Sequence, residues 1–210
     1  MKLFLSRNEN KSRTLFENGT RQLAPEACLG YQPDMLSVII ETHNDEEGLA
    51  RTLASLVSGA VEGMVRDVVV CDRGSTDGTR TVAEHAGCAW VEGGIAAAIA
   101  AAKGDWLLLL EPGARPAEGW TEAVATHAAG SGMAARFSRD RADRTPFLSR
   151  ILSRPGPLAQ GLLLPRRQAL ALVRNADSAE ALGRGLAVKT LKTAIQPARR
   201  VGRETGLASP

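Results

Sequence analysis

The sequence predicts an α/β protein, a single domain built on a mostly parallel sheet with helices on both faces. Short apolar runs at 36–42, 66–72 and 105–113 alternate with longer stretches of helical period. The runs are rich in Val, Ile and Leu and lack polar alternation, which is typical of strands covered on both faces. Parallel neighbours need a crossover between them, and the helical stretches supply it.

Length and composition agree with this fold class. The 210 residues are enough for one sizeable core, and 44% hydrophobic with 23% charged residues is an ordinary globular composition. Residues 1–35 lack sustained periodicity and are polar in stretches. We therefore interpret them as an N-terminal extension that is partly irregular.

The first half of the folded region alternates between strand and helix in a regular order. Polar residues before each helical stretch are good caps: Asn44 or Asp45 for the first helix, and Ser75 or Thr76 for the second. Gly87 is expected to end the second helix. The predicted strands are 36–42, 66–72, 88–93 and 105–113, and the helices between and after them are 45–59, 75–87, 95–104 and 118–130.

The pattern is weaker after Gly132. Apolar and amphipathic stretches still alternate there, so the sheet is expected to continue. The predicted elements are a strand at 133–140, a helix at 145–154, a strand, turn and helix within 160–173, a helix at 177–188 and a strand at 190–197.

Charge and residue usage restrict the partners. The net charge is +3, and its basic excess is clustered in the second half, which favours an anionic partner such as a phosphorylated substrate or an acidic membrane surface. For any single cluster, a solvated basic face is the default interpretation. Aromatic residues make up 4%, too few for a stacking platform, so no nucleic acid is expected. Three cysteines without CxxC spacing indicate neither a disulfide framework nor a zinc site. We expect a cytoplasmic protein, with contact to the inner face of the membrane left open.

Polar, glycine-rich segments follow three of the predicted strands. They read "ETHNDEE" at 41–47, "DRGSTDGT" at 72–79 and "EPGARP" at 111–116. In open α/β sheets ligands bind outside the carboxyl ends of the strands, so these segments predict a binding site.

In this order the segments resemble family 2 glycosyltransferases, which have a Rossmann-like nucleotide-sugar-binding domain of the GT-A type. "SVIIETHNDEEGLARTLASL" is similar to the family's opening strand and helix with its Pro-Thr-Tyr-Asn-Glu, and "VVVCDRGSTDGT" to its Asp-x-Gly-Ser-Thr-Asp-Gly-Thr turn. The resemblance is to short bacterial members and covers about 36–206. It implies a glycosyltransferase-like domain with a nucleotide-binding half at 36–130 and an acceptor half at 131–206.

The resemblance implies a nucleotide site at the first two strand ends. Asp72 matches the family aspartate that binds the donor's base, and the glycines beside it, including Gly74, let the base approach the backbone. The alternative for the acidic and hydroxyl residues of this turn is capping of the next helix, which we favour for Ser75 and Asp77. The other residues assigned to the nucleotide are Thr42, His43, Asn44 and Glu46, with His43 in place of the family's aromatic residue and Glu46 equally suited to the first turn of a helix.

The family's metal motif is incomplete here. Relatives hold Mg²⁺ or Mn²⁺ through acidic residues, and the ion stabilises the leaving diphosphate. Glu111 matches one acid, but Gly113 stands where the second is expected. One carboxylate is a poor magnesium site. Mg²⁺ or Mn²⁺ is therefore a possible cofactor, and whether the protein depends on it is left open. The alternative for Glu111 is an ordinary polar residue at a strand end.

The residues for chemistry lie late in the chain. Inverting relatives use an acidic residue near this point to deprotonate the acceptor hydroxyl, and the stretch "NADSAEALGRGL" offers Asp177 and Glu180. Of the two, Asp177 is the preferred base, while their spacing also fits a helix capping pair. Arg199 and Arg200 are candidates to bind the diphosphate as charged donors, or are simply solvated.

Two functions remain after this comparison. The first is an inverting glycosyltransferase that moves a sugar from a nucleotide-diphosphate donor to a hydroxyl acceptor. The second is a catalytically inactive nucleotide- or sugar-binding protein on the same fold, which the missing second acid favours. A dinucleotide-dependent oxidoreductase is set aside, because its Gly-x-Gly-x-x-Gly does not follow the first strand.

Overall fold

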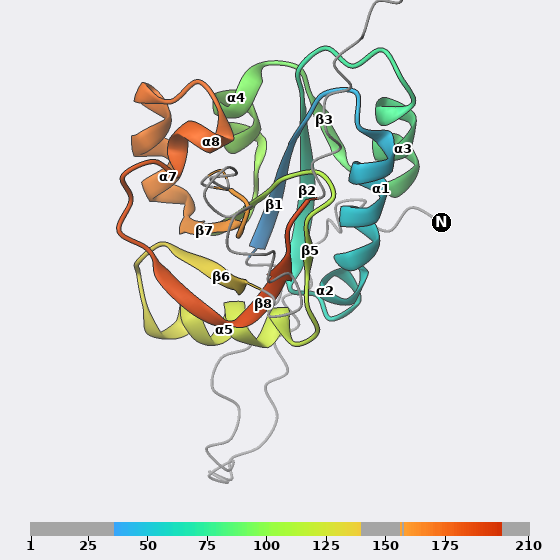
Figure 1. The fold of residues 1–210 in the computed structure, drawn as a ribbon. Coiled ribbons are helices and arrows are strands. Elements are labelled where there is room, and N and C mark those ends of the chain that lie inside the picture. Colours follow the sequence, from blue (N-terminus) through green and yellow to red (C-terminus); the bar gives the residue numbers. More distant parts are fainter. Residues whose placement is uncertain (1–35, 140–155, 157, 199–210) are drawn as a thin grey trace, which may run out of the picture.

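The computed structural model describes residues 36–139, 156 and 158–198, which form a single α/β unit (Figure 1). Its sheet has eight strands in the order β3-β2-β1-β4-β7-β6-β8-β5. The elements in chain order are β1 (Leu36–Thr42), α1 (Glu46–Ser55), α2 (Val57–Val61), β2 (Val65–Asp72), α3 (Thr79–Ala86), β3 (Ala89–Val91), α4 (Gly94–Ala101), β4 (Trp106–Leu110), β5 (Arg115–Pro116), α5 (Trp120–Gly130), β6 (Ala135–Arg139), β7 (Leu162–Pro165), α7 (Arg166–Leu172), a 3-10 helix (Val173–Asn175), α8 (Ala179–Leu182) and β8 (Lys189–Gln196).

The sheet is mixed but mostly parallel. β1 lies inside the sheet and pairs in parallel with β2 on one side and β4 on the other. The later strands add antiparallel pairs, β4 with β7, β7 with β6 and β8 with β5, while β6 and β8 run parallel. The predicted fold class is confirmed. In this register Thr42 lies opposite Asp72 and Ile40 opposite Leu110, so three strands end at the same edge of the sheet.

Two apolar layers explain why the central strands are apolar throughout. Alternate residues of β1 point to opposite faces, so Val38 and Ile40 pack in one core and Ile39 in the other. The first core includes residues of α1, α3 and α5, and the second includes residues of α4, α7 and α8. Figure 1 shows α1, α2 and α3 on one side of the sheet and α4, α7 and α8 on the other.

The helix ends agree with the sequence only in part. Asp45 caps α1, its carboxylate accepting from the backbone N–H of Gly48 at 2.9 Å, as expected. Gly87 ends α3 in the left-handed conformation, with φ of 80°, as expected. The expected cap at Ser75 or Thr76 is wrong, because α3 begins only at Thr79. A break at Leu56 divides the predicted helix 45–59 into α1 and α2.

The second half contains β6, β7 and β8 close to where they are predicted. No turn separates β7 from α7, since the helix starts at the residue after Pro165. The predicted helix at 177–188 is only four residues long, and Gly183 and Gly185 lie just beyond its end. The extension 1–35 and the predicted helix 145–154 lie outside the described residues, as do the basic residues at 140–144 and 199–203. Within the described ranges, no helix is long and apolar enough to cross a membrane.

Candidate active site

A cavity of about 220 Å³ opens at the carboxyl ends of β1 and β4, beside the end of β2. Its walls include residues from all three strand ends, together with residues that precede and form α8. The strand ends near 42, 72 and 111 therefore come together, as the resemblance implied. The lining residues are Glu41, Thr42, His43, Arg73, Leu110, Glu111, Leu158, Ser178 and Glu180.

Two larger cavities, of about 720 and 570 Å³, lie elsewhere. They share Pro165 and Arg167, and one reaches Trp106 at the start of β4, which is the opposite end of that strand. We place the candidate site in the smaller cavity, because it lies where ligands of open α/β sheets bind and because several polar groups converge there.

Thr42 ends β1 and is one of the residues that line this cavity. The residue is 2% exposed, and its Oγ1 makes no hydrogen bond to any residue that the structure describes. A buried polar group without a partner costs folding free energy, so such groups in native proteins call for an explanation. The hydroxyl is itself enclosed by the protein, so a ligand would reach it only if the neighbouring groups moved.

Asp72 ends β2 and organises the turn that follows. Its Oδ2 accepts from the backbone N–H groups of Gly74 and Ser75, both at 2.9 Å, and its Oδ1 accepts from the Ser75 hydroxyl at 2.5 Å. Burial raises the pKa of Asp72, but these hydrogen bonds, led by that of the Ser75 side chain, outweigh it and bring the pKa below its ordinary value. The carboxylate is thus held ionised and fixed in direction.

Asn44 joins the two loops at the first strand ends. It has φ of 49°, its N–H donates to Ser75 Oγ at 2.9 Å, and its Oδ1 accepts from the backbone N–H of Thr76 at 2.7 Å. Asp77, expected to cap the next helix, accepts from the N–H of Thr79 at 3.0 Å, but the N-cap position of α3 is Gly78, and no side chain caps the helix. The loops after β1 and β2 therefore form one connected unit.

The remaining nucleotide candidates divide into two groups. Thr42 and His43 line the cavity, and His43 is exposed. Asn44, Glu46, Asp72 and Gly74 lie outside its walls, in the loops and helix start next to it. Glu46 extends from α1 towards the turn after β2, where a Cβ on Gly78 would collide with its carboxylate. Gly74 has φ of 87° with open space where its Cβ would be, a conformation that suits glycine.

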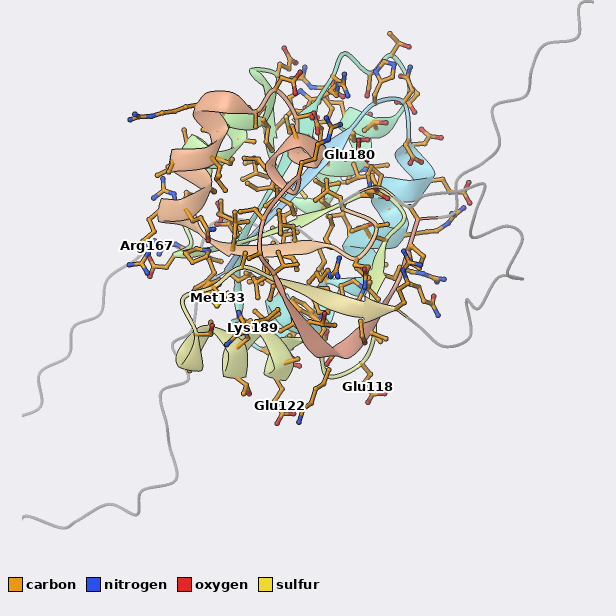
Figure 2. All side chains as sticks on the ribbon, turned by 60° about the vertical axis from the view of Figure 1, so that its left-hand side comes forward. Glu118, Glu122, Met133, Arg167, Glu180 and Lys189 are labelled. Atoms are coloured by element: carbon orange, nitrogen blue, oxygen red, sulfur yellow. The ribbon has the colours of Figure 1, made fainter. Side chains whose placement is uncertain are left out.

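The candidates for chemistry are also separated by the structure. Glu180 is half-buried and lines the cavity, whereas Asp177 is exposed and is not among its lining residues. The Asp177 carboxylate accepts from the Ser178 hydroxyl at 3.4 Å, and it is Ser178 that caps α8. Arg199 and Arg200 lie outside the described residues. Figure 2 shows Glu180 on α8, well away from Glu118 and Glu122 near the start of α5.

Sequence reasoning missed two charged residues of the cavity, Glu41 and Arg73. Glu41 Oε2 accepts from the backbone N–H of Ala179 at 2.9 Å, and its Oε1 lies 3.9 Å from Arg73 Nε. Glu41 precedes Thr42 and Arg73 follows Asp72, and both of these neighbours were predicted site residues. The sequence has no pattern that predicts the contact of Glu41 with Ala179, which lies 138 positions away.

The family of this chain follows from a comparison with protein-family models. The model described as glycosyl transferase family 2 matches residues 37–150, more than half of the chain. The chain belongs to glycosyl transferase family 2. The matched range contains β1 to β6 and therefore the three strand ends of the cavity. No curated protein matches the sequence at the level that would make it a relative.

Solved structures of other proteins share the fold of this family member. Glucosyl-3-phosphoglycerate synthase from Mycobacterium tuberculosis, crystallised with Mn²⁺, UDP and glucosyl-3-phosphoglycerate, is 20% identical with a TM-score of 0.52, covering 80% of this chain and 73% of that chain. Its complex with Mg²⁺ and UDP is 18% identical with a TM-score of 0.51, and the match covers 80% of this chain and 72% of that chain. A mycobacterial protein is 20% identical with a TM-score of 0.54, and the match covers 80% of this chain and 68% of that chain. Identities this low establish the common fold alone.

The described residues of this family member do not fit a divalent ion held by paired acids. Glu111 lines the cavity, but Gly113 has φ of 88°, and a Cβ there would lie 3.4 Å from Ala198 Cβ. The N–H of Gly113 donates to Gly48 O at 2.9 Å and to Thr52 Oγ1 at 2.8 Å, so the loop is fixed against α1. Across the described ranges, no group of three His, Cys, Asp or Glu side chains is placed to hold a metal.

Proposed function

We propose that this chain transfers a sugar from a nucleotide-diphosphate donor to a hydroxyl acceptor, with inversion at the anomeric carbon. The observation that carries the proposal is the cavity formed at three strand ends, which Thr42, Glu111 and Glu180 line. Membership of glycosyl transferase family 2 supports it, as do UDP-bound structures of the same fold.

The loops after β1 and β2 would bind the nucleotide. The Asp72 carboxylate is held ionised and would accept a hydrogen bond from a ring N–H of the base. His43 is exposed beside it and would stack on the base. Asn44 keeps the two loops together through its bonds to Ser75 and Thr76. Gly74 leaves room for the base at the backbone, and Glu46 would reach a ribose hydroxyl.

Glu180 is the general base that we propose. It lines the cavity, while the alternative Asp177 is exposed and outside its walls. Glu180 would take the proton of the acceptor hydroxyl as that oxygen attacks the anomeric carbon of the donor sugar. The bond between that carbon and the diphosphate oxygen breaks, and the nucleoside diphosphate leaves with its electron pair. No step is assigned to a divalent ion, and Arg199 and Arg200 stay candidates to hold the diphosphate.

The second candidate is an inactive nucleotide-binding protein on the same fold. The geometry of Gly113 favours it, because the place of the family's second acid is taken by a glycine in the left-handed conformation. Such a protein would keep the nucleotide site at Thr42 and Asp72 and would catalyse no transfer.

Calorimetric titration with UDP and GDP, with and without Mn²⁺, tests the nucleotide site. We expect one of the two to bind, with an affinity that Mn²⁺ changes less than about tenfold, because only Glu111 offers a carboxylate where the family's pair is expected. Binding of neither nucleotide under either condition would reject both candidate functions.

Turnover separates the two candidates. We expect transfer or slow hydrolysis of a matching nucleotide-sugar donor by the wild type. Glu180→Gln is expected to lower kcat about 100-fold or more, the usual contribution of a general base, while its affinity for the nucleotide stays unchanged. Asp177→Asn is the matched comparison and should keep most of the activity. A wild type that binds nucleotide without turnover of any donor would favour the inactive protein.

A further inference from the structure

α8 presents Glu180 to the cavity although it has little stability of its own. It contains four residues, and isolated helices of this length do not form in water. Tertiary contacts must therefore hold it. Ala179 and Leu182, each 2% exposed, pack in the core on the α4 and α7 side of the sheet. Glu180 follows Ala179 in the helix and lines the cavity. Figure 2 shows its position on α8.

The first turn of α8 is held from outside by Glu41. The first N–H groups of a helix have no partner within the helix, and side chains commonly supply one. Ser178 supplies an acceptor for Ala181, whose N–H donates to its hydroxyl at 3.3 Å. Glu41 supplies the other, because its Oε2 accepts from the N–H of Ala179 at 2.9 Å. A carboxylate is well suited to this end of a helix.

The Glu41 carboxylate is itself well placed for this role. It extends from the end of β1, and its side chain is 14% exposed. Arg73, at 3.9 Å, is 64% exposed, and an ion pair so open to solvent contributes little energy. The bond to Ala179 is therefore the contact that connects the strand end to α8.

We propose that Glu41 is a positioning residue that holds α8, and with it the carboxylate of Glu180, against the cavity. The part that concerns catalysis by Glu180 rests on the proposed function. The part that concerns α8 does not, because it predicts the stability of one helix in the protein without substrate.

Amide hydrogen exchange, followed by NMR on the full chain without substrate, tests the structural part. Exchange at 178–182 is expected to be tenfold or more faster in Glu41→Ala, because the Ala179 N–H loses its acceptor. Glu41→Gln keeps an amide oxygen there, and its exchange should rise about threefold. Glu122→Ala is the control, an exposed acid on α5, and should leave 178–182 unchanged. If exchange at 178–182 in Glu41→Ala is as slow as in the wild type, the proposal is overturned. If the alanine variant does not fold, the same result in Glu41→Gln overturns it.

Steady-state kinetics test the catalytic part. Glu41→Ala is expected to lower kcat tenfold or more while the KM for the donor stays within about twofold, and Glu41→Gln should recover most of that kcat. A loss of donor binding with unchanged kcat would contradict positioning of Glu180. A wild type without any turnover would reject the proposed function, and the exchange of 178–182 would still decide the role of Glu41.

Discussion

Two buried threonines provide a direct test of the ligand site. Thr42 Oγ1 has no partner among the described residues, whereas Thr52 Oγ1 accepts from the N–H of Gly113 at 2.8 Å. Replacing an unpaired hydroxyl by a methyl group of the same shape removes a penalty, so Thr42→Val should be unchanged or up to about 2 kcal/mol more stable to urea. Thr52→Val should lose about 1 kcal/mol, because its hydrogen bond is made.

The same Thr42→Val variant should bind the nucleotide less tightly. If the hydroxyl donates to or accepts from the ligand, its loss is expected to weaken the affinity about fivefold or more in calorimetry, since a typical net hydrogen bond is worth about 1 kcal/mol. Greater stability together with weaker binding is the expected signature. A Thr42→Val protein with wild-type affinity for every nucleotide would show that the Thr42 hydroxyl does not bind the ligand.

Asp72 gives a prediction about pH. Its three hydrogen bonds favour the ionised form in the folded state, so its pKa there is below that in the unfolded chain. The stabilisation is therefore complete above the ordinary aspartate pKa of about 3.9, and it is lost as the pH falls through the lower, folded value. Asp72→Ala should lose about 1–2 kcal/mol at pH 6 in urea unfolding. The gap to the wild type should narrow steadily below pH 4, and a constant gap down to pH 3 would contradict this account.

The loops after β1 and β2 are expected to act as one unit through Asn44. Asn44→Ala removes the acceptor of the Thr76 N–H and places a Cβ-bearing residue without a side-chain amide at φ of 49°. Asn44→Gly also removes the acceptor but tolerates that φ. Both variants should weaken UDP or GDP binding about tenfold in calorimetry, and only alanine should also lower the unfolding temperature. Full affinity in Asn44→Gly would show that the connection between the loops is dispensable.

The strands and most helices could be predicted because their signals are local. β1 and β4 are apolar on both faces, and this alone marks central strands of a parallel sheet. Helix ends were harder. The Ser75 hydroxyl donates to Asp72 and does not cap a helix. Asp77 accepts from the N–H of Thr79, and α3 begins only at Thr79. Glycines beyond Leu182 shortened α8 in a stretch where an apolar period suggested a longer helix.

The site was predictable to the extent that the sheet defines it. Parallel strands bring their carboxyl ends to one edge, so Thr42 and Glu111 meet in one cavity although far apart in sequence. Contacts that the sheet topology does not define could not be predicted from the sequence. The contact of Glu41 with Ala179 joins residues 138 positions apart, and Leu158 reaches the cavity from a stretch without periodicity. Choosing between Asp177 and Glu180 likewise needed the orientation of α8.

Cys71 connects the proposed nucleotide site to the stability of the whole fold. It lies in β2 within the core, and burial, followed by the charges of Glu41 and Asp72, raises its pKa to about 11. Only about a thousandth of this thiol would be thiolate at pH 8 even if a reagent could reach it, so labelling requires the sheet to open. Burial also raises the pKa of Cys88, to about 12. In a Cys28→Ser background, both thiols should resist iodoacetamide for hours in the folded protein and react on unfolding in urea.

Nucleotide should slow this labelling by mass action. A ligand that binds only the folded protein lowers the population of the open form by a factor of one plus the ratio of the free ligand concentration to Kd, so a concentration of about 100 times Kd should slow Cys71 labelling about 100-fold. Cys71 is next to Asp72 in β2, so a purely local effect of the ligand would slow the labelling of Cys71 and leave that of Cys88 unchanged. Cys88 lies outside that strand and serves as the internal control. Equal slowing of both thiols indicates binding to the folded sheet as a unit, whereas rates unaffected by UDP and GDP would show that the strand-end cavity binds neither.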